Sequence, residues 1–289
     1  MASSSILGID LGGTKTVMTR FDAGTLERQE ERRWATRAKD GMEEVLKDIV
    51  LTAEELRRAD TTGVGIGVPG LVAQPEGRLI NAPNIKDARD LPLKLLLEEQ
   101  LQLPVTVDND ANCFVLVESA MGAAVGKKVV VGITFGTGVG GGVVIDGNIF
   151  RGAHGYAAEI GHMLLLPGKP PYETDYHRGE VEQFLSGTAL GKRCPSANDP
   201  REYLEGDTCS FLRPDIFREI AWLCTNLTHL LDPDMIVFGG STGHAFQPHL
   251  EDIRREQQEW MLPGTPVPEL AIARLKDAGT LGAALLMRA

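Results

Sequence analysis

Cysteines and aromatic residues are scarce in this sequence, and long apolar runs are absent. Only 6% of its 289 residues are Phe, Trp or Tyr, and its four cysteines (Cys113, Cys194, Cys209 and Cys224) form no Cys-x-x-Cys pair. This cysteine pattern favours free thiols in a cytoplasmic protein. No apolar run approaches the roughly 20 residues of a transmembrane helix, and no secretory signal precedes the first apolar segment. We therefore expect no membrane partner.

Positively charged residues are also fewer than negatively charged ones. The chain carries 29 Lys and Arg against 40 Asp and Glu, which gives a net charge of −11. An acidic protein is poorly suited to bind nucleic acid or an anionic membrane. The hydrophobic fraction of 43% is that of an ordinary globular protein. The length allows a large core and two domains.

No P-loop and no dinucleotide-binding fingerprint occurs, but two other glycine-rich turns do. The first turn, 11–14, follows a predicted strand at 6–10 and precedes another at 15–22. Adjacent glycines let backbone N–H groups converge on an anion, although a plain hairpin turn is the alternative. Asp10 before the turn, with Thr14 and Lys15 after it, suits a metal–phosphate group better than a plain turn.

The second glycine turn, 136–138, repeats this plan of strand, glycine turn and strand, with strands at 129–135 and 139–145. We expect two related domains that face each other across a cleft. Gly140, Gly141 and Gly142 lie inside the second strand, weaken it, and are hard to explain by packing.

Between the two turns in the sequence, a short strand at 105–107 leads into an apolar helix that starts near Ala111. Asp108 and Asp110 lie at this junction, beside the free N–H groups of the helix. Either carboxylate could simply cap the helix. However, the segment lies between two phosphate-sized turns in the sequence, so one of these carboxylates is a candidate for a general base.

Further along, three other segments have polar or glycine signals. Glu159 and His162 lie one helical turn apart, as in a surface ion pair or half of a metal site. The polar stretch 175–182 is most simply a solvated loop. The buried strand predicted at 235–238 ends in Gly239 and Gly240, which suits either a ligand or a plain turn.

Taken together, these segments resemble the ROK family of bacterial sugar kinases and sugar-responsive repressors. The resemblance spans essentially the whole chain in order, and it rests on residues 7–16, 109–112, 136–142, 159–162 and 232–234. It implies the α/β actin-like ATPase (ribonuclease H-like) fold, in which two domains close over ATP and a sugar. We expect domains at 1–118 and 119–277, with the helix 278–289 packing back on the first. Repressor members have an N-terminal DNA-binding helix-turn-helix, whereas here the first turn begins close to Met1. This difference and the acidic charge favour a kinase.

The resemblance also implies roles for individual residues. Asp110 matches the catalytic base, and Asp10 matches the residue that holds Mg²⁺, directly or through water. The residues that match sugar ligands are Asn109, Glu159, His162 and Glu182, with Gly70 and Asn84 as weaker candidates for the sugar pocket. The residues that match ATP contacts are Asp10, Gly12, Gly13, Thr14 and Lys15 in the first turn, Gly136, Thr137 and Gly138 in the second, and Gly239 and Gly240.

Two positions depart from the family pattern. Ala158 stands where a glycine commonly precedes the sugar-binding glutamate. Many members have a zinc site made by the histidine and three cysteines, but Glu173, Asp175 and Glu180 occupy the cysteine positions here. We therefore expect no structural zinc. Either these oxygens bind a hard cation weakly, or the loop is held by ion pairs and packing, for which the candidates are Lys169, Tyr172, Tyr176, His177 and Arg178.

The expected activity is that of an ATP-dependent hexose kinase acting on the 6-hydroxyl of glucose or a close relative. The alternatives are an N-acetylglucosamine or N-acetylmannosamine kinase, a fructokinase or, in another class, a non-catalytic sugar-sensing regulator. We expect ATP and Mg²⁺ as cofactors and a homodimer as the assembly.

Overall fold

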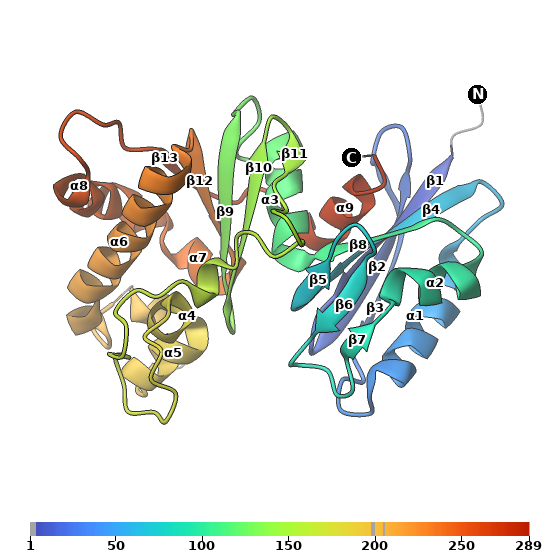
Figure 1. The fold of residues 1–289 in the computed structure, drawn as a ribbon, viewed down its shortest axis with the longest axis horizontal. Coiled ribbons are helices and arrows are strands. Elements are labelled where there is room, and N and C mark those ends of the chain that lie inside the picture. Colours follow the sequence, from blue (N-terminus) through green and yellow to red (C-terminus); the bar gives the residue numbers. More distant parts are fainter. Residues whose placement is uncertain (1–3, 198–199, 205, 289) are drawn as a thin grey trace. The chain divides into compact units, whose positions relative to one another are not determined.

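A computed structural model describes residues 4–197, 200–204 and 206–288, and the chain divides into two compact units. Unit 1 contains the chain up to Val117, the segment Asn148–Ala157 and the chain from Leu275 onward. Unit 2 contains Glu118–Gly147 and Ala158–Arg274. Each unit has a five-stranded sheet and its own hydrophobic core (Figure 1).

The sheet of unit 1 has the strand order β3-β2-β1-β4-β8. Its strands are β1 (Ser5–Leu11), β2 (Lys15–Asp22), β3 (Arg28–Ala35), β4 (Thr61–Val68) and β8 (Val105–Asn109). Strands β1 and β2 form an antiparallel hairpin, whereas β1, β4 and β8 are parallel. In the register, Asp10 pairs with Gly67, and Gly67 pairs with Asp108. The carboxyl ends of the parallel strands thus bring the first glycine turn and the Asp108–Asp110 segment to one edge of the sheet.

Helices and a small sheet complete unit 1. They are α1 (Met42–Leu56), α2 (Leu93–Leu101), the start of α3 (Asp110–Met121), α9 (Ala278–Leu285), and the three strands β5 (Leu71–Ala73), β6 (Arg78–Asn81) and β7 (Arg89–Leu91). Helices α1 and α2 cover one face of the five-stranded sheet, and α9 covers the other (Figure 1). The backbone of α9 touches the sheet, because a Cβ on Gly8 would lie 2.1 Å from the Thr280 carbonyl oxygen, and one on Gly65 would lie 1.8 Å from that of Ala283.

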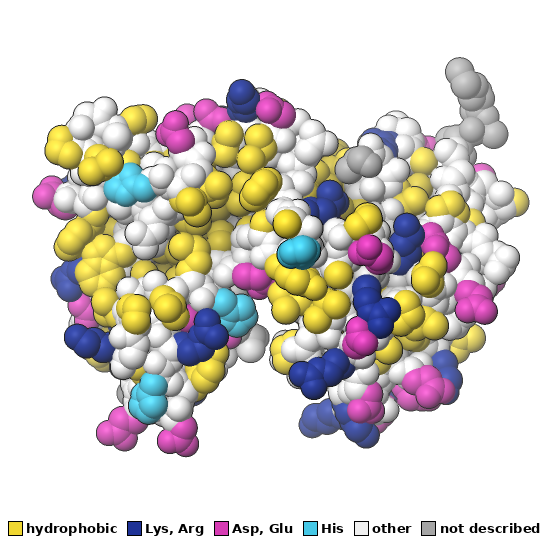
Figure 2. All heavy atoms as spheres, in the orientation of Figure 1, with side chains coloured by type: hydrophobic (Ala, Val, Ile, Leu, Met, Phe, Trp, Pro, Cys, Tyr) yellow, Lys and Arg dark blue, Asp and Glu magenta, His cyan; other side chains and the backbone are white. Residues whose placement is uncertain are grey.

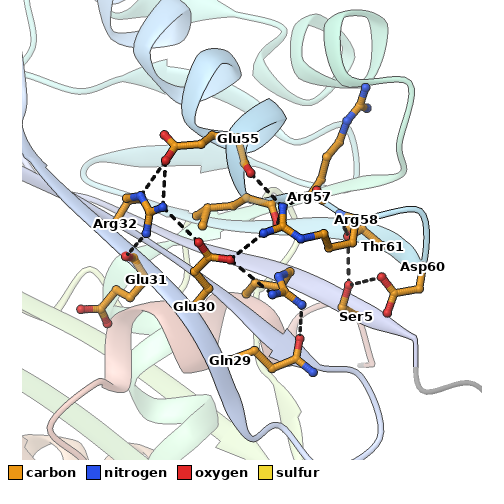
Figure 3. A network of polar contacts seen from close by, with 12 residues as sticks. Ser5, Gln29, Glu30, Glu31, Arg32, Glu55, Arg57, Arg58, Asp60 and Thr61 are labelled. Carbon is orange, nitrogen blue, oxygen red and sulfur yellow. Dashed lines mark hydrogen bonds and ion pairs between the residues drawn. The ribbon is translucent and has the colours of Figure 1, made fainter.

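Strand β3 lies at the edge of this sheet and is strongly charged. Glu30 forms ion pairs with Arg20, Arg32 and Arg58, at distances of 3.3, 3.0 and 3.0 Å. Arg32 also pairs with Glu55 of α1, so that the network joins the strand to the helix (Figure 3). Charged side chains on an edge strand discourage pairing with a strand of another molecule.

Unit 2 repeats the topology of unit 1 with the order β11-β10-β9-β12-β13. Its strands are β9 (Val129–Phe135), β10 (Val139–Ile145), β11 (Asn148–Ile149), where the chain passes on to unit 1, β12 (Met235–Gly239) and β13 (Glu269–Ile272). Strands β9 and β10 form the antiparallel hairpin, and β9, β12 and β13 are parallel. The matching strand order confirms the predicted repeat of the strand, glycine turn and strand plan.

The helices of unit 2 lie around this sheet. They are the 3₁₀ helices η1 (Ile160–His162), η2 (Pro200–Tyr203), η3 (Ser210–Leu212) and η4 (Gln247–His249), and the α-helices α4 (Val181–Leu185), α5 (Gly187–Arg193), α6 (Arg213–Leu231), α7 (Gly240–Ala245) and α8 (Leu250–Trp260). None of the helices in the described part of the chain is long and apolar enough to cross a membrane. Figure 2 shows hydrophobic side chains gathered over the part of unit 2 around α6.

Gly141, in the glycine run of β10, has a packing explanation, so the expectation that the run lacked one is wrong for this residue. A Cβ on Gly141 would lie 2.5 Å from Cδ1 of Ile160, and one on Gly161 would lie 2.1 Å from the Val139 carbonyl oxygen. The segment that carries Glu159 and His162 therefore lies directly on the backbone of β10.

The expectation of four free thiols is also wrong. Cys194 and Cys209 form a disulfide in unit 2, whereas Cys113 and Cys224 are free and buried. The two bonded cysteines lie 15 residues apart in the sequence, on either side of η2. No spacing motif in the sequence predicts this disulfide.

Candidate active site

Asp10 lies at the carboxyl end of β1, next to the first glycine turn. A Cβ on Gly279 would lie 2.4 Å from Asp10 Oδ2, so this carboxylate lies against the first turn of α9, where free N–H groups favour negative charge. Burial raises the pKa of Asp10 above its ordinary value, and the positive charge of Lys15 opposes the rise. The turn itself is closed by a hydrogen bond of 3.0 Å from the Gly12 N–H to the Lys15 carbonyl oxygen. Thr14 and Lys15 are exposed.

Asp108 and Asp110 lie in different environments in the structure. Asp108 is buried, and its oxygens accept hydrogen bonds of 2.8 Å from the Asn109 N–H, the Asn112 amide and the Arg151 guanidinium. It is a structural residue. Asp110 opens α3, is only half-buried, and accepts a hydrogen bond of 2.8 Å from the Ala111 N–H. Of the two, Asp110 is therefore the better candidate for a base.

Arg151 is a residue that the sequence reasoning missed. It comes from the segment Asn148–Ala157, 43 residues after its partner Asp108 in the sequence. Neither a motif nor a periodic pattern marks it, so only the folded structure reveals the pairing.

The electrostatics of a buried thiol show that the acidic side chains of unit 1 lie close together. Burial raises the pKa of Cys113 well above its ordinary value, and the negative charges of Asp108, Asp110 and Asp10 add to the rise. These carboxylates thus lie near Cys113 in the first part of α3. They give unit 1 an acidic site next to a glycine turn.

The weaker candidates for the sugar pocket lie at the same edge. The Asn109 amide donates a hydrogen bond of 2.9 Å to the Gly70 carbonyl oxygen. Gly70 has a φ of 92°, and a Cβ there would lie 2.0 Å from the Asn81 carbonyl oxygen. A Cβ on Gly13 would lie 3.0 Å from Cβ of Asn84, so Asn84 lies against the first turn. The fold thus brings these residues together, while their contacts with a sugar stay a prediction.

In unit 2, Glu159, His162 and Glu182 form a second group. Glu159 immediately precedes η1, His162 ends it, and Glu182 lies in α4. Burial raises the pKa of Glu159, a positive charge on His162 would lower it, and the charge of Glu182 raises it further. The three side chains are therefore close enough to influence one another.

The second glycine turn lies beside this group. The Val139 N–H donates a hydrogen bond of 2.8 Å to Glu182 Oε2. The Gly187 N–H and the Thr188 hydroxyl donate to the carbonyl oxygens of Gly136 and Thr137, each at 2.7 Å. Thr188 is another residue that the sequence reasoning missed.

The Gly239–Gly240 pair lies at the neighbouring end of β12. Gly239 pairs with Thr134 of β9, and Gly240 has a φ of 80°. A Cβ on Gly240 would lie 2.3 Å from the Phe135 carbonyl oxygen, so this glycine is required by packing whether or not it touches a nucleotide. Gly136 differs, because a Cβ there would meet no atom within 4 Å and its φ lies outside the left-handed region. No packing reason explains Gly136, which favours a ligand contact.

The residues at the family's zinc positions do not fit a zinc site. The Glu180 side chain is 3% exposed and is paired with Arg178 Nε at 3.0 Å and His162 Nδ1 at 3.3 Å, whereas Glu173 and Asp175 are exposed. In the part of the chain that the structure describes, no group of three or more His, Cys, Asp or Glu side chains is placed to hold a metal ion. The loop is held by ion pairs and by packing such as that of Lys192 over the ring of Tyr172. The absence of zinc from the protein stays a prediction.

Known proteins resemble this chain over nearly its whole length. It is 34% identical over 304 residues to the N-acetyl-D-glucosamine kinase of Erwinia tasmaniensis, covering 96% of this chain and 98% of that one. It is 32% identical over 320 residues to the glucokinase of Halalkalibacterium halodurans, with coverages of 100% and 96%. The crystal structure of a ROK family glucokinase from Streptomyces griseus, in complex with glucose and AMPPNP, matches with a TM-score of 0.77 and 31% identity over 98% of this chain and 99% of that one.

The model of the ROK family matches residues 6–289. Together with the structural match, this confirms the predicted family and the actin-like ATPase fold. The chain belongs to the ROK family.

Proposed function

We propose that this protein is an ATP-dependent hexose kinase that transfers the γ-phosphate to a sugar hydroxyl, the 6-hydroxyl of glucose or of a close relative. The observation that carries the proposal is the half-buried carboxylate of Asp110 at the start of α3, at the same sheet edge as the first glycine turn. The glucokinases and N-acetylglucosamine kinases among the relatives support it.

The chemistry needs alignment, a base and compensation of phosphate charge. Asp110 would take the proton of the hydroxyl as its oxygen attacks the γ-phosphorus. Asp108 is unsuited to this role, because its oxygens already accept three N–H hydrogen bonds. Glu159, His162 and Glu182 would hold sugar hydroxyls, and the backbone N–H groups of the glycine turns would hold phosphate oxygens.

Asp10 is proposed to hold Mg²⁺, directly or through water. The half-buried carboxylate of Asp10 beside a phosphate turn fits this ion, which usually keeps several waters and binds through one or two carboxylates and substrate phosphates. Bound there, the ion would offset phosphate charge. Replacing Asp10 by Asn should raise the Mg²⁺ concentration needed for half-maximal activity, while sugar binding without nucleotide stays unchanged. Loss of sugar affinity with an unchanged Mg²⁺ requirement would contradict this role.

The decisive experiment is an ADP-release assay with glucose, N-acetylglucosamine, N-acetylmannosamine and fructose, on the unaltered protein and on Asp110→Asn. General-base catalysis contributes about 10²–10⁴-fold, so kcat should fall by that order with little change in KM. Asp108→Asn is the matched control, and it should lower the melting temperature because it weakens the pairing with Arg151. Unaltered turnover in Asp110→Asn would contradict the proposal. Sugar binding without ADP release in the unaltered protein would favour the regulator.

We also propose that the protein is a cytoplasmic homodimer. Exposed apolar side chains of unit 2 support an interface, with Leu230, Trp260 and Leu262 being 73, 47 and 60% exposed. Light scattering combined with gel filtration measures the assembly directly. Fractionation of cells that express the protein measures its location.

A further inference from the structure

Glu180 is a buried carboxylate that pairs with His162 and with Arg178. It immediately precedes α4, and its side chain is 3% exposed. Its partners are far more exposed, at 51% for Arg178 and 55% for His162. Removing a carboxylate from water is costly unless charged or polar partners compensate. Its place here therefore calls for a specific reason.

Helix capping supplies only part of that reason: Glu180 is the N-cap of α4 and forms a capping box with Gln183. Glutamate is not among the side chains that are favoured at a helix N-cap. Gln183 already serves the start of α4, because its Oε1 accepts hydrogen bonds from the Gly179 and Glu180 N–H groups at 2.7 and 3.4 Å. What the long carboxylate of Glu180 adds is its contact with His162 Nδ1.

We infer that Glu180 is a positioning residue for His162: by holding Nδ1, its carboxylate fixes the tautomer of the imidazole and leaves Nε2 to bind a sugar hydroxyl. A neutral imidazole has one N–H, and a carboxylate acceptor at Nδ1 keeps the proton on that nitrogen. Nε2 then carries the lone pair and accepts the hydroxyl proton in a hydrogen bond. The inference rests on the proposed sugar-kinase function and assigns a task to a residue outside the sugar-contacting set.

The surrounding backbone makes this task separable from folding. Leu164 and Glu180 form an antiparallel bridge, and the Val181 N–H donates to the Met163 carbonyl oxygen at 2.9 Å. These bonds hold the segment after η1 against the start of α4 without any side chain. The Gln183 half of the capping box does not need the Glu180 side chain, so we expect changes at Glu180 to affect the His162 ring more than the backbone.

The test compares Glu180→Leu, which removes the acceptor, with Glu180→Gln, which keeps an oxygen for Nδ1–H. Loss of one sugar hydrogen bond corresponds to about a tenfold change in binding. The KM for glucose or N-acetylglucosamine, whichever the protein phosphorylates, should rise by about that factor in Glu180→Leu and stay near normal in Glu180→Gln. The KM for ATP should not change. Arg178→Leu is the matched control, since it removes the other partner of Glu180 and should leave sugar KM unaltered.

Two further readouts distinguish positioning from a general structural role. In a His162→Gln background, Glu180→Leu should add nothing to the rise in sugar KM, because the two residues act as one unit. An additive rise would overturn the inference. Nitrogen-15 spectra of the imidazole should show the Nδ1–H tautomer in the unaltered protein and lose it in Glu180→Leu.

The spectroscopic test is independent of turnover. If Glu180→Leu fails to fold, or if the protein phosphorylates neither sugar, the tautomer of His162 in the unaltered protein still tests the inference. The Nε2–H form would overturn the inference even if the kinase proposal holds. The Nδ1–H form would support it even if the activity proves to be different.

Discussion

Glu182 Oε2 accepts a hydrogen bond from the backbone N–H of Val139, with 2.8 Å between the two atoms. Val139 directly follows the second glycine turn, and Glu182 is the α4 carboxylate that we propose as a sugar ligand. A Cβ on Gly138 would lie only 2.4 Å from the same oxygen, so the turn has no room for a side chain there. One hydrogen bond therefore links the second glycine turn, which we propose to bind the nucleotide, to a carboxylate that we propose to bind the sugar.

This link predicts different effects for two substitutions of Glu182. Glu182→Gln keeps an oxygen for the Val139 N–H, so sugar KM should rise about tenfold while ATP KM stays near normal. Glu182→Ala leaves that N–H without its acceptor, so ATP KM should rise as well. Steady-state kinetics with each substrate varied separately measures both constants. Equal ATP KM values in the two variants would contradict the link.

Alanine substitutions at Gly136, in the second glycine turn, and at Gly141, in β10, should impair the protein for different reasons. Gly136→Ala meets no atom within 4 Å, so we expect an unchanged melting temperature and a higher ATP KM, because the methyl group would occupy phosphate space. Gly141→Ala overlaps Ile160 and should cost about 1–3 kcal/mol of stability. Thermal unfolding beside ATP kinetics makes the comparison. A Gly136→Ala variant with unchanged ATP kinetics would remove the second turn from the nucleotide site.

Ala158 is strained, and glycine should relieve the strain. Its φ is 66°, in the left-handed region that costs an L-residue roughly 1–2 kcal/mol, part of which glycine loses again through its greater freedom in the unfolded chain. Ala158→Gly should therefore stabilise the protein by about 0.5–1 kcal/mol and raise the melting temperature by about 2 °C. The neighbouring Ala157→Gly is the control, because Ala157 is not in that region, and it should destabilise. Destabilisation by both would contradict the assignment of strain.

Glu219 should make stability depend on pH. It forms a buried bidentate ion pair with Arg193, at 2.6 and 3.0 Å, yet burial outweighs the effect of that arginine and raises the pKa of Glu219 to about 7. An unfolded glutamate titrates near about 4.3, so the folded state holds the proton more tightly. This contribution to stability is fully present below about pH 4.3 and is lost as the pH rises through about 7.

The measurement is the free energy of unfolding of the unaltered protein relative to Glu219→Gln, which keeps a hydrogen bond to Arg193. The difference should fall between about pH 5 and about pH 8, by up to about 3 kcal/mol. Parallel stability curves for the two proteins across this range would show that Glu219 stays ionised beside Arg193.

Local patterns predicted much of the fold. Apolar residues at helical spacing between 214 and 232 are typical of the helix that the structure shows as α6, and prolines at 92 and 104 bracket the helix α2. Such signals work because helix periodicity and proline geometry act within a few residues. The glycine turns and the strand order likewise follow from a repeated local plan.

Long-range partners could not be predicted in the same way. Asp108 and Asp110 look alike in the sequence, and the difference between them depends on Arg151, 43 residues away from Asp108. Gly141 looks like a weak point in a strand until Ile160 is seen to pack on it. The Cys194–Cys209 disulfide was missed for the same reason, since only the folded chain decides which thiols meet.

The close contact of α9 with β1 and β4 has a consequence for synthesis on the ribosome. Translation releases Gly8 and Gly65 early, but the backbone of α9 that covers them comes from Ala278–Leu285. Nascent unit 1 must therefore wait, with one face of its sheet uncovered, while all of unit 2 is made. Early-finished domains usually fold as they emerge. Here the first strands of the protein depend on α9, the last helix that the structure describes, so premature termination before Ala278 would yield a product prone to aggregation rather than a stable half-molecule.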